Sequence, residues 1–101
     1  MYYLYIFLYS LTSNLYYVGS SDNYERRLME HNNSERTTFT SKHRPWQIVA
    51  VYECGTERAE ALRIERYVKK QKSRKFIERL IQEDTHTGLL AQLVRVPIVR
   101  D

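Results

Sequence analysis

The length, composition and charge of this chain exclude several classes of protein. Its 101 residues are 43% hydrophobic and 13% aromatic, which is typical of one folded domain and argues against a disordered chain. The only cysteine, Cys54, excludes an internal disulfide and a cysteine-rich metal site. We expect a cytoplasmic protein, because a lone cysteine fits a reducing compartment and no apolar run has the length of a membrane helix.

Two tyrosine-rich segments at the start of the chain predict a pair of strands. Residues 2–9 (YYLYIFLY) are almost continuously apolar, and residues 15–20 follow after a polar turn of hairpin length. Side chains alternate across a strand, so Tyr5 and Tyr17 each lie on a face that carries other apolar or small residues. Gly19 ends the second strand, where the backbone needs to bend or to be approached closely.

The next segment predicts a helix that carries an arginine and a histidine. Asp22 and Glu25 have the spacing of a capping box, so we expect Asp22 to cap the helix. Arg27 and His31 fall on the same helical face as Leu28, and this face should point inward. Two interpretations are open. Arg27 and His31 belong to a site beside the tyrosines, or Arg27 lies at the core edge and His31 caps the helix C-terminus.

A polar loop, expected over residues 32–44, leads to a further strand and a long helix. The strand over residues 46–54 is apolar on both faces, so we expect it to lie centrally in the sheet. Thr56 is the expected cap of the helix that follows, which runs to about Gln71.

Glu65 sits on or beside the apolar stripe of this long helix. A buried carboxylate is costly unless it is paired or bound to a cation, so its position indicates a functional site. The alternative is an exposed ion pair with Lys69, four residues later on the same helix. Helical spacing alone leaves both interpretations open.

Positive charge is concentrated around the start of the last predicted helix, which covers residues 74–82 and begins after the expected cap Ser73. Residues 66–79 carry seven basic side chains against one glutamate, a local net charge of +6 in a chain of +4 overall. A basic segment of this kind suits a phosphate backbone, although a solvated helix face has the same composition. Residues 1–83 are the predicted domain, and residues 84–101 are expected to form a tail or a short helix that packs on it.

The predicted order of elements is strand, strand, helix, strand, helix, helix. We therefore expect an α/β (α+β) fold in which helices flank a small three-stranded, mainly antiparallel sheet.

At this point the residues resemble a known family, the GIY-YIG nucleases, which are named after two short motifs on adjacent strands. The second motif matches YVG at residues 17–19, and the first matches YLY at residues 3–5 with tyrosine in place of glycine. The family places an arginine on the following helix, often with a histidine one turn later, as in Arg27 and His31. It places a metal-binding glutamate on a later helix, as in Glu65.

The resemblance implies a metal-dependent endonuclease that hydrolyses DNA phosphodiester bonds. Glu65 would hold Mg²⁺ or Mn²⁺, and Arg27 would donate to the scissile phosphate. Tyr5 or Tyr17 would orient or deprotonate the attacking water, with His31 as the rival base. The short chain leaves little room for a separate recognition domain, so selectivity for DNA structure, as in repair or recombination, is the expectation; RNA remains open as a substrate.

The resemblance also implies roles for the glycine of the second motif and for the basic segment. Gly19 would contribute its backbone to the second motif. The predicted nucleic-acid contacts are Lys69, Lys70, Lys72, Arg74 and Lys75. The chain departs from the family in the first-motif glycine and in having no asparagine after Asn33, where several family nucleases use one beyond the metal glutamate. Two alternatives follow: a catalytically silent nucleic-acid-binding module of the same fold, and a protein-interaction domain that uses its tyrosines.

Overall fold

The computed structural model describes residues 1–9, 15–33, 46–83, 86 and 88–97, and for Leu8, Tyr9 and Leu89 it describes the backbone alone. In chain order the elements are β1 (Tyr2–Tyr9), β2 (Tyr16–Ser21), α1 (Tyr24–Asn33), β3 (Trp46–Gly55), α3 (Arg58–Lys70), α4 (Arg74–Gln82), the 3₁₀ turn η1 (Gly88–Leu90) and β4 (Val94–Arg95). The predicted order of strands and helices is confirmed through α4. The predicted turn after β1 and most of the predicted polar loop lie outside the described residues.

The strands form one antiparallel sheet in the order β2-β1-β3-β4. The prediction of three strands is wrong by one, because β4 pairs with Tyr52 and Glu53 of β3. A strand of two residues is too short to show any period in the sequence, which is why it was missed. As expected, β3 lies inside the sheet, and β2 forms one edge.

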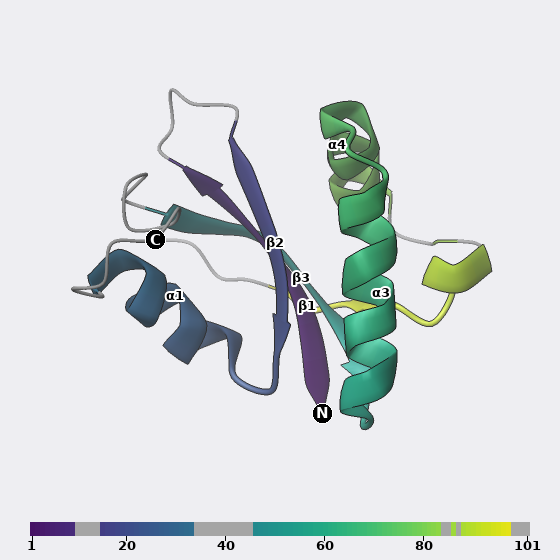
Figure 1. The fold of residues 1–101 in the computed structure, drawn as a ribbon, viewed down its shortest axis with the longest axis horizontal. Helices are drawn as coiled ribbons and strands as arrows, with labels where there is room; N and C mark the ends of the chain where they lie inside the picture. Colours follow the sequence, from purple (N-terminus) through teal and green to yellow (C-terminus); the bar gives the residue numbers. More distant parts are fainter. Residues whose placement is uncertain (10–14, 34–45, 84–85, 87, 98–101) are drawn as a thin grey trace.

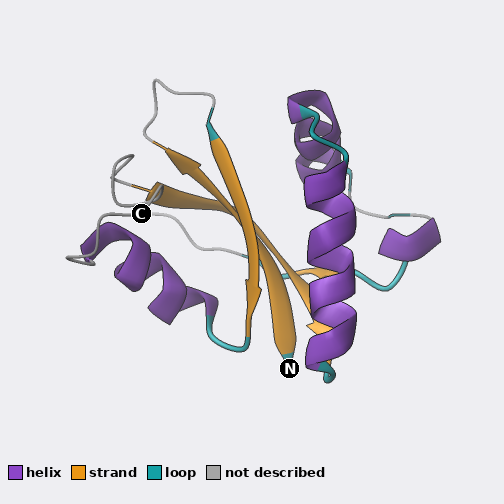
Figure 2. Ribbon diagram, in the orientation of Figure 1, coloured by secondary structure: helices purple, strands orange, loops and turns teal. Residues whose placement is uncertain are grey.

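Helices cover both faces of the sheet, with α1 on one side and α3 and α4 on the other (Figures 1 and 2). On the α3 side, Leu4 and Ile6 of β1 pack in the larger hydrophobic core with Ile64 of α3. On the α1 side, Tyr5 and Phe7 of β1 form the smaller core. A strand covered on both faces needs apolar residues at every position, which explains the unbroken apolar run of β1.

Two predicted helix caps are wrong, each by one residue. The side-chain oxygen of Asn23, not Asp22, accepts the backbone N–H of Arg26 at 3.0 Å, and α1 begins after it. Glu57, not Thr56, holds the N-cap position of α3, and its side chain makes no capping hydrogen bond. Asp22 and Asn23 both have side chains that can cap a helix, and Thr56 precedes the carboxylate of Glu57. Residue type alone therefore does not decide which neighbour holds the cap position.

The other helix ends are closer to expectation. The predicted cap Ser73 is confirmed, since its hydroxyl accepts the backbone N–H of Phe76 at 3.1 Å. Helix α1 continues two residues into the predicted loop, and the side chain of Asn32 binds both backbone groups of Trp46, at 2.7 and 3.1 Å. This double hydrogen bond ties the end of α1 to the start of β3.

The described part of residues 84–101 packs against the sheet. Leu90 and Leu93 are buried in the larger core, and the N–H of Val96 donates to the carbonyl of Val51 at 2.8 Å. Among the described residues no helix is both long and apolar enough to cross a membrane.

Gly19 lets β1 and β2 approach each other closely. Tyr5 is its partner in the strand register, and a Cβ atom added to Gly19 would lie 2.3 Å from the Tyr5 hydroxyl oxygen. Tyr5 is 1% exposed, and its ring stacks on Phe7 with a centroid distance of 4.5 Å, so the ring has little room to move. Glycine is therefore required here to let the Tyr5 hydroxyl lie over the backbone of the edge strand.

Replacing Gly19 with alanine tests this close approach. We expect Gly19→Ala to lower the free energy of unfolding by about 1–3 kcal/mol, the usual cost of forcing extra volume into a packed site. Urea denaturation followed by circular dichroism gives this quantity. The cost should shrink when Tyr5 is also replaced by leucine, because the clash is with the distal part of the tyrosine. An equal cost in both backgrounds would contradict the assigned role of Gly19.

Candidate active site

Tyr5 and Arg27 meet on the α1 side of the sheet. Tyr5 projects from β1 over Gly19, and the guanidinium of Arg27 on α1 donates a hydrogen bond to its hydroxyl oxygen. Burial raises the pKa of Tyr5 to about 12, although the hydrogen bond from Arg27 opposes this rise. The same hydrogen bond raises the pKa of Arg27 above its ordinary value. Tyr5 is thus a neutral phenol near pH 7 that orients a permanent cation.

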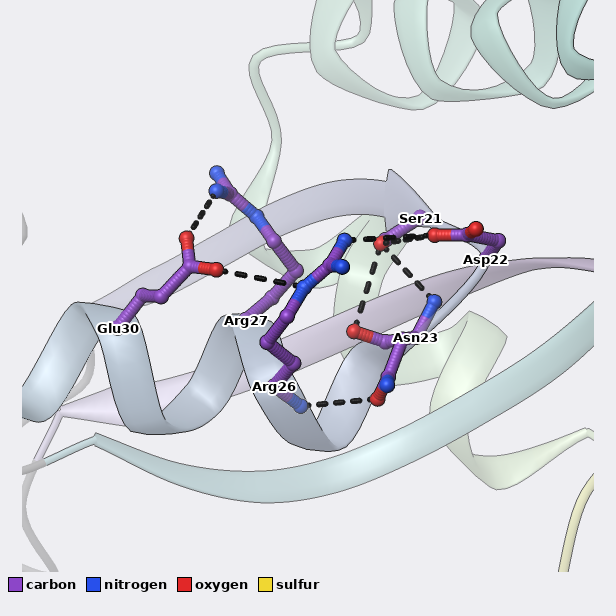
Figure 3. Close-up of polar contacts among 6 residues, drawn as sticks. All are labelled: Ser21, Asp22, Asn23, Arg26, Arg27 and Glu30. Carbon is purple, nitrogen blue, oxygen red and sulfur yellow. Dashed lines mark hydrogen bonds and ion pairs between the residues drawn. The ribbon is translucent and has the colours of Figure 1, made fainter.

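Arg27 has a second partner on its own helix, Glu30. Its Nη1 atom lies 2.7 Å from Oε2 of Glu30, while the neighbouring Arg26 bridges Glu30 and Asp22 at 3.4 and 3.5 Å (Figure 3). A guanidinium carries five N–H donors, so contacts with Tyr5 and Glu30 fix its direction and leave donors for an anion. The side chain is 37% exposed, which gives such an anion access from solvent.

His31 points inward, as expected from its helical position, and is 7% exposed. Its ring lies 4.7 Å from the ring of Tyr17 and 5.4 Å from that of Phe7, between centroids. The Nε2 atom is buried, and the described residues offer it no hydrogen-bond partner. Burial, with a smaller contribution from Arg27, lowers the pKa of His31 to about 4. The imidazole is therefore neutral near pH 7.

Tyr17 is the second residue of the edge strand β2 and is only partly buried. One side of it packs against the buried rings of His31 and Trp46, the latter at a centroid distance of 6.0 Å. The ammonium nitrogen of Lys69, which comes from α3, lies 5.5 Å from the centroid of the Tyr17 ring. Tyr17 is thus partly exposed to solvent and lies against side chains of both α1 and α3.

Glu65 lies on the opposite side of β2 and is held by two donors. The hydroxyl of Ser20 donates to Oε1 at 2.5 Å, and the ammonium of Lys69 lies 2.7 Å from Oε2. The carboxylate side chain is 18% exposed, so it is largely desolvated. Its negative charge also contributes, as the smallest cause, to the raised pKa of Tyr5. The pair with Lys69 is confirmed, on a carboxylate that is largely desolvated, whereas a role for Glu65 in a functional site stays a prediction.

The candidate residues thus wrap around the edge strand rather than lining one face. Odd-numbered Tyr17 and Gly19 face α1, whereas Ser20 faces α3 and meets Glu65 there. Figure 1 shows β2 running between α1 and α3, with the rest of the sheet behind it. At an interior strand the neighbouring strands would separate these two groups; at an edge they share access to solvent.

Two hollows lie along β2, one at each end. The first, which we call the α3–α4 groove, has a volume of about 360 Å³ and lies between the start of β2 and the turn that joins α3 to α4. Its lining includes Tyr16, Tyr17, Lys69, Lys72 and Arg74. Of the five predicted nucleic-acid contacts, Lys70 and Lys75 are not among its lining residues.

The second hollow, which we call the Arg27 pocket, has a volume of about 460 Å³ and lies at the end of β2. Its lining includes Ser20, Arg26, Arg27 and Arg58. Sequence reasoning missed Ser20, Arg26 and Arg58. Arg26 and Arg58 lie in ordinary charged helix turns, and Ser20 gains its meaning only from a contact with a residue 45 positions away.

The donor set fits one kind of metal site. Within the part of the chain that the structure describes, no group of three or more His, Cys, Asp or Glu side chains could hold a metal ion. Mg²⁺ commonly binds through one or two carboxylates, with waters and substrate phosphate as its other ligands. Glu65, a carboxylate that keeps 18% exposure and whose partner Ser20 lines the Arg27 pocket, suits such a site.

Comparison with known proteins identifies relatives of this chain. The sequence model of the GIY-YIG catalytic domain matches residues 1–78, which include Tyr5, Tyr17, Arg27 and Glu65. The chain is also similar to a UPF0213 protein of Bacillus licheniformis, with 33% identity over 85 residues, 84% of this chain and 86% of the relative. The match extends from β1 into α4 and thus spans both helical layers around the edge strand, so the chain belongs to the GIY-YIG family.

Proposed function

We propose that this protein is a metal-dependent endonuclease that hydrolyses DNA phosphodiester bonds. The observation that carries the proposal is the convergence of Tyr5, Tyr17, Arg27 and Glu65, from four different elements, at the edge strand β2. Such a constellation supplies a cation for the phosphate, hydroxyls for water and a carboxylate for a metal. The chain belongs to a family whose matching domain is described as catalytic.

Arg27 is the residue we assign to the scissile phosphate. Attack on a phosphodiester is slow because its anionic oxygens repel the nucleophile, and charge builds up on them in the transition state. The planar guanidinium offers paired donors that match a phosphate, and Tyr5 and Glu30 hold it in place beforehand. Donors fixed in advance avoid a reorganisation cost at the moment of reaction.

Tyr17 is the residue we assign to the attacking water. Tyr5 is a poor base, because burial raises its pKa to about 12 and its oxygen already accepts from Arg27. His31 is neutral but is 7% exposed, so it supports the Tyr17 ring from behind and does not meet solvent water directly. Tyr17 is partly exposed and lines the α3–α4 groove, so it is the tyrosine that would orient the attacking water.

Glu65 is the residue that would hold Mg²⁺ or Mn²⁺, with Ser20 fixing the direction of its carboxylate. When bound, the metal would stabilise negative charge on the phosphate and on the leaving 3′ oxygen. Ser20, which binds Glu65, lines the Arg27 pocket together with Arg27, so metal and guanidinium would act on the same phosphate group.

The two hollows support binding of a polyanion along β2. The α3–α4 groove carries Lys69, Lys72 and Arg74, and the Arg27 pocket adds Arg26 and Arg58. Cations spaced along a surface bind phosphates without reading bases, so we propose selectivity for DNA structure. Lys70 and Lys75, outside the groove lining, would add to the positive field. A role in repair or recombination is consistent with this kind of selectivity.

One alternative has a specific observation in its favour. Both oxygens of Glu65 are engaged, by Ser20 and Lys69, and the chain has no asparagine after Asn33. A catalytically silent module that binds nucleic acid through the basic hollows would have these features as well. The two functions differ in cleavage and in metal dependence.

Cleavage of supercoiled plasmid and of a panel of branched DNAs tests the proposal directly. We expect cutting with Mg²⁺ or Mn²⁺, none with EDTA, and at least a hundredfold slower cutting by Glu65→Gln, on the scale of a lost charged transition-state contact. Glu60→Gln is the matched control, because Glu60 lies on the same helix and pairs with Arg63 at 2.7 Å on an exposed surface. Binding without cutting by the wild type would establish the silent module instead.

Arg27 and its neighbour Arg26 form a second matched pair for mutation. We expect Arg27→Ala to reduce the cleavage rate about a hundredfold or more and to change DNA affinity little, because Arg27 acts mainly in the transition state. Arg26→Ala removes the same charge from an exposed position and should affect cleavage much less. Rates under single-turnover conditions and affinities from fluorescence anisotropy separate the two effects. A proportional loss of binding and cleavage in Arg27→Ala would rule out the assigned role.

The buried neutral imidazole of His31 predicts how stability depends on pH. The unfolded chain takes up a proton near the ordinary pKa of 6.5, whereas the folded chain does so only near 4. Stability from this residue is therefore complete above pH 6.5 and is lost as the pH falls towards 4. The difference corresponds to about 3 kcal/mol.

Urea unfolding of wild type and His31→Phe between pH 7 and pH 4 measures this effect. Both proteins lose stability from other groups, so the informative quantity is the difference between their curves. We expect the wild type to lose more of its free energy of unfolding than the variant over this range. Parallel curves would show that His31 is not held neutral by the fold.

A further inference from the structure

Lys69 is one of the predicted nucleic-acid contacts, and its partners in the structure give it a place in the candidate active site as well. Its ammonium lies 2.7 Å from Oε2 of Glu65 and 5.5 Å from the ring centroid of Tyr17. Its side chain is 45% exposed and lines the α3–α4 groove together with Lys72 and Arg74. One flexible cation therefore touches the candidate metal carboxylate, the candidate water-orienting tyrosine and the candidate DNA groove.

The pairing of Glu65 places Lys69 in competition with a metal ion. Ser20 takes Oε1 of the carboxylate and Lys69 takes Oε2. A divalent cation bound at this carboxylate, which is only 18% exposed, would lie close to the ammonium, and like charges at such a distance repel each other. Binding of the metal therefore requires Lys69 to move away.

The groove gives Lys69 a place to move to. Lysine has a long flexible stem and a compact charge, so it can exchange one anionic partner for another without movement of the helix. A DNA phosphate in the α3–α4 groove would offer that second partner, since Lys69 already lines the groove. Transfer of Lys69 to the phosphate leaves Oε2 of Glu65 open for the metal.

We propose that Lys69 couples the two binding events: without DNA it competes with the metal for Glu65, and with DNA it moves to a phosphate and releases the carboxylate. The inference rests on the proposed function and adds a regulatory property to the same site. Because coupling between two ligands is reciprocal, the metal must also raise the affinity for DNA. An ordinary ion pair between exposed residues four positions apart would leave metal affinity nearly unchanged.

Binding of Mn²⁺, followed by electron paramagnetic resonance, tests the coupling without any cleavage. Wild type, Lys69→Met and Lys69→Arg are compared without DNA and with a short nuclease-resistant phosphorothioate duplex. We expect Lys69→Met to bind Mn²⁺ about five- to tenfold more tightly than wild type when DNA is absent. DNA should raise the affinity of the wild type more than that of the variant. Lys69→Arg keeps the charge and should restore wild-type behaviour.

Arg63→Met is the matched control, because Arg63 forms an exposed pair with Glu60 on the same helix at 2.7 Å. It removes one positive charge from α3 and should bind Mn²⁺ as the wild type does. Equal Mn²⁺ affinities of wild type and Lys69→Met without DNA would overturn the coupling and leave the metal site in place. If Mn²⁺ binding is absent from all these proteins, or is unchanged in Glu65→Gln, the metal site itself is wrong and the coupling with it.

Discussion

The candidate site depends on the contact between Tyr5 and the backbone of Gly19. Tyr5 belongs to an interior strand, and its hydroxyl reaches the edge strand because no Cβ atom stands in the way. There the hydroxyl accepts a hydrogen bond from Arg27, and the negative charge of Glu65 contributes to its raised pKa. A larger residue at position 19 would push the phenol away and remove the link between the two halves of the site.

Charge balance explains how so many polar groups are held at the edge of a hydrophobic core. A desolvated carboxylate or guanidinium is costly unless it has partners, and here each one does. Arg27 lies between Tyr5 and Glu30, and Glu65 lies between Ser20 and Lys69. His31 is the exception, and it avoids the cost by remaining neutral, since burial lowers its pKa to about 4. The pairs keep the ligand-free site stable, and each must be at least partly exchanged when an anion or a cation binds.

Local periodicity was enough to predict which residues share a face, but not which elements meet. Alternation along the first strand and helical spacing after the second correctly predicted that Tyr5 lies on an apolar face and that Arg27 and His31 share one helical face. The meeting of these two faces was one of two open interpretations. The contact of Ser20 with Glu65 joins residues 45 positions apart and leaves no local pattern. The strand β4 and the caps of α1 and α3 were missed for a related reason. Neighbouring residues there have similar local propensities, and tertiary structure decides which of them caps the helix or joins the sheet.

The position of the site at a sheet edge bears on what this domain can recognise. An edge strand is open on its outer side, and here its two ends meet hollows that both carry cations. A phosphate backbone that follows β2 would pass Arg27, Tyr17 and Lys69 in turn and would contact few bases. Contacts of this kind fix the position of the backbone but carry little sequence information. The shape and flexibility of the nucleic acid at the cleavage point would then determine which substrates fit.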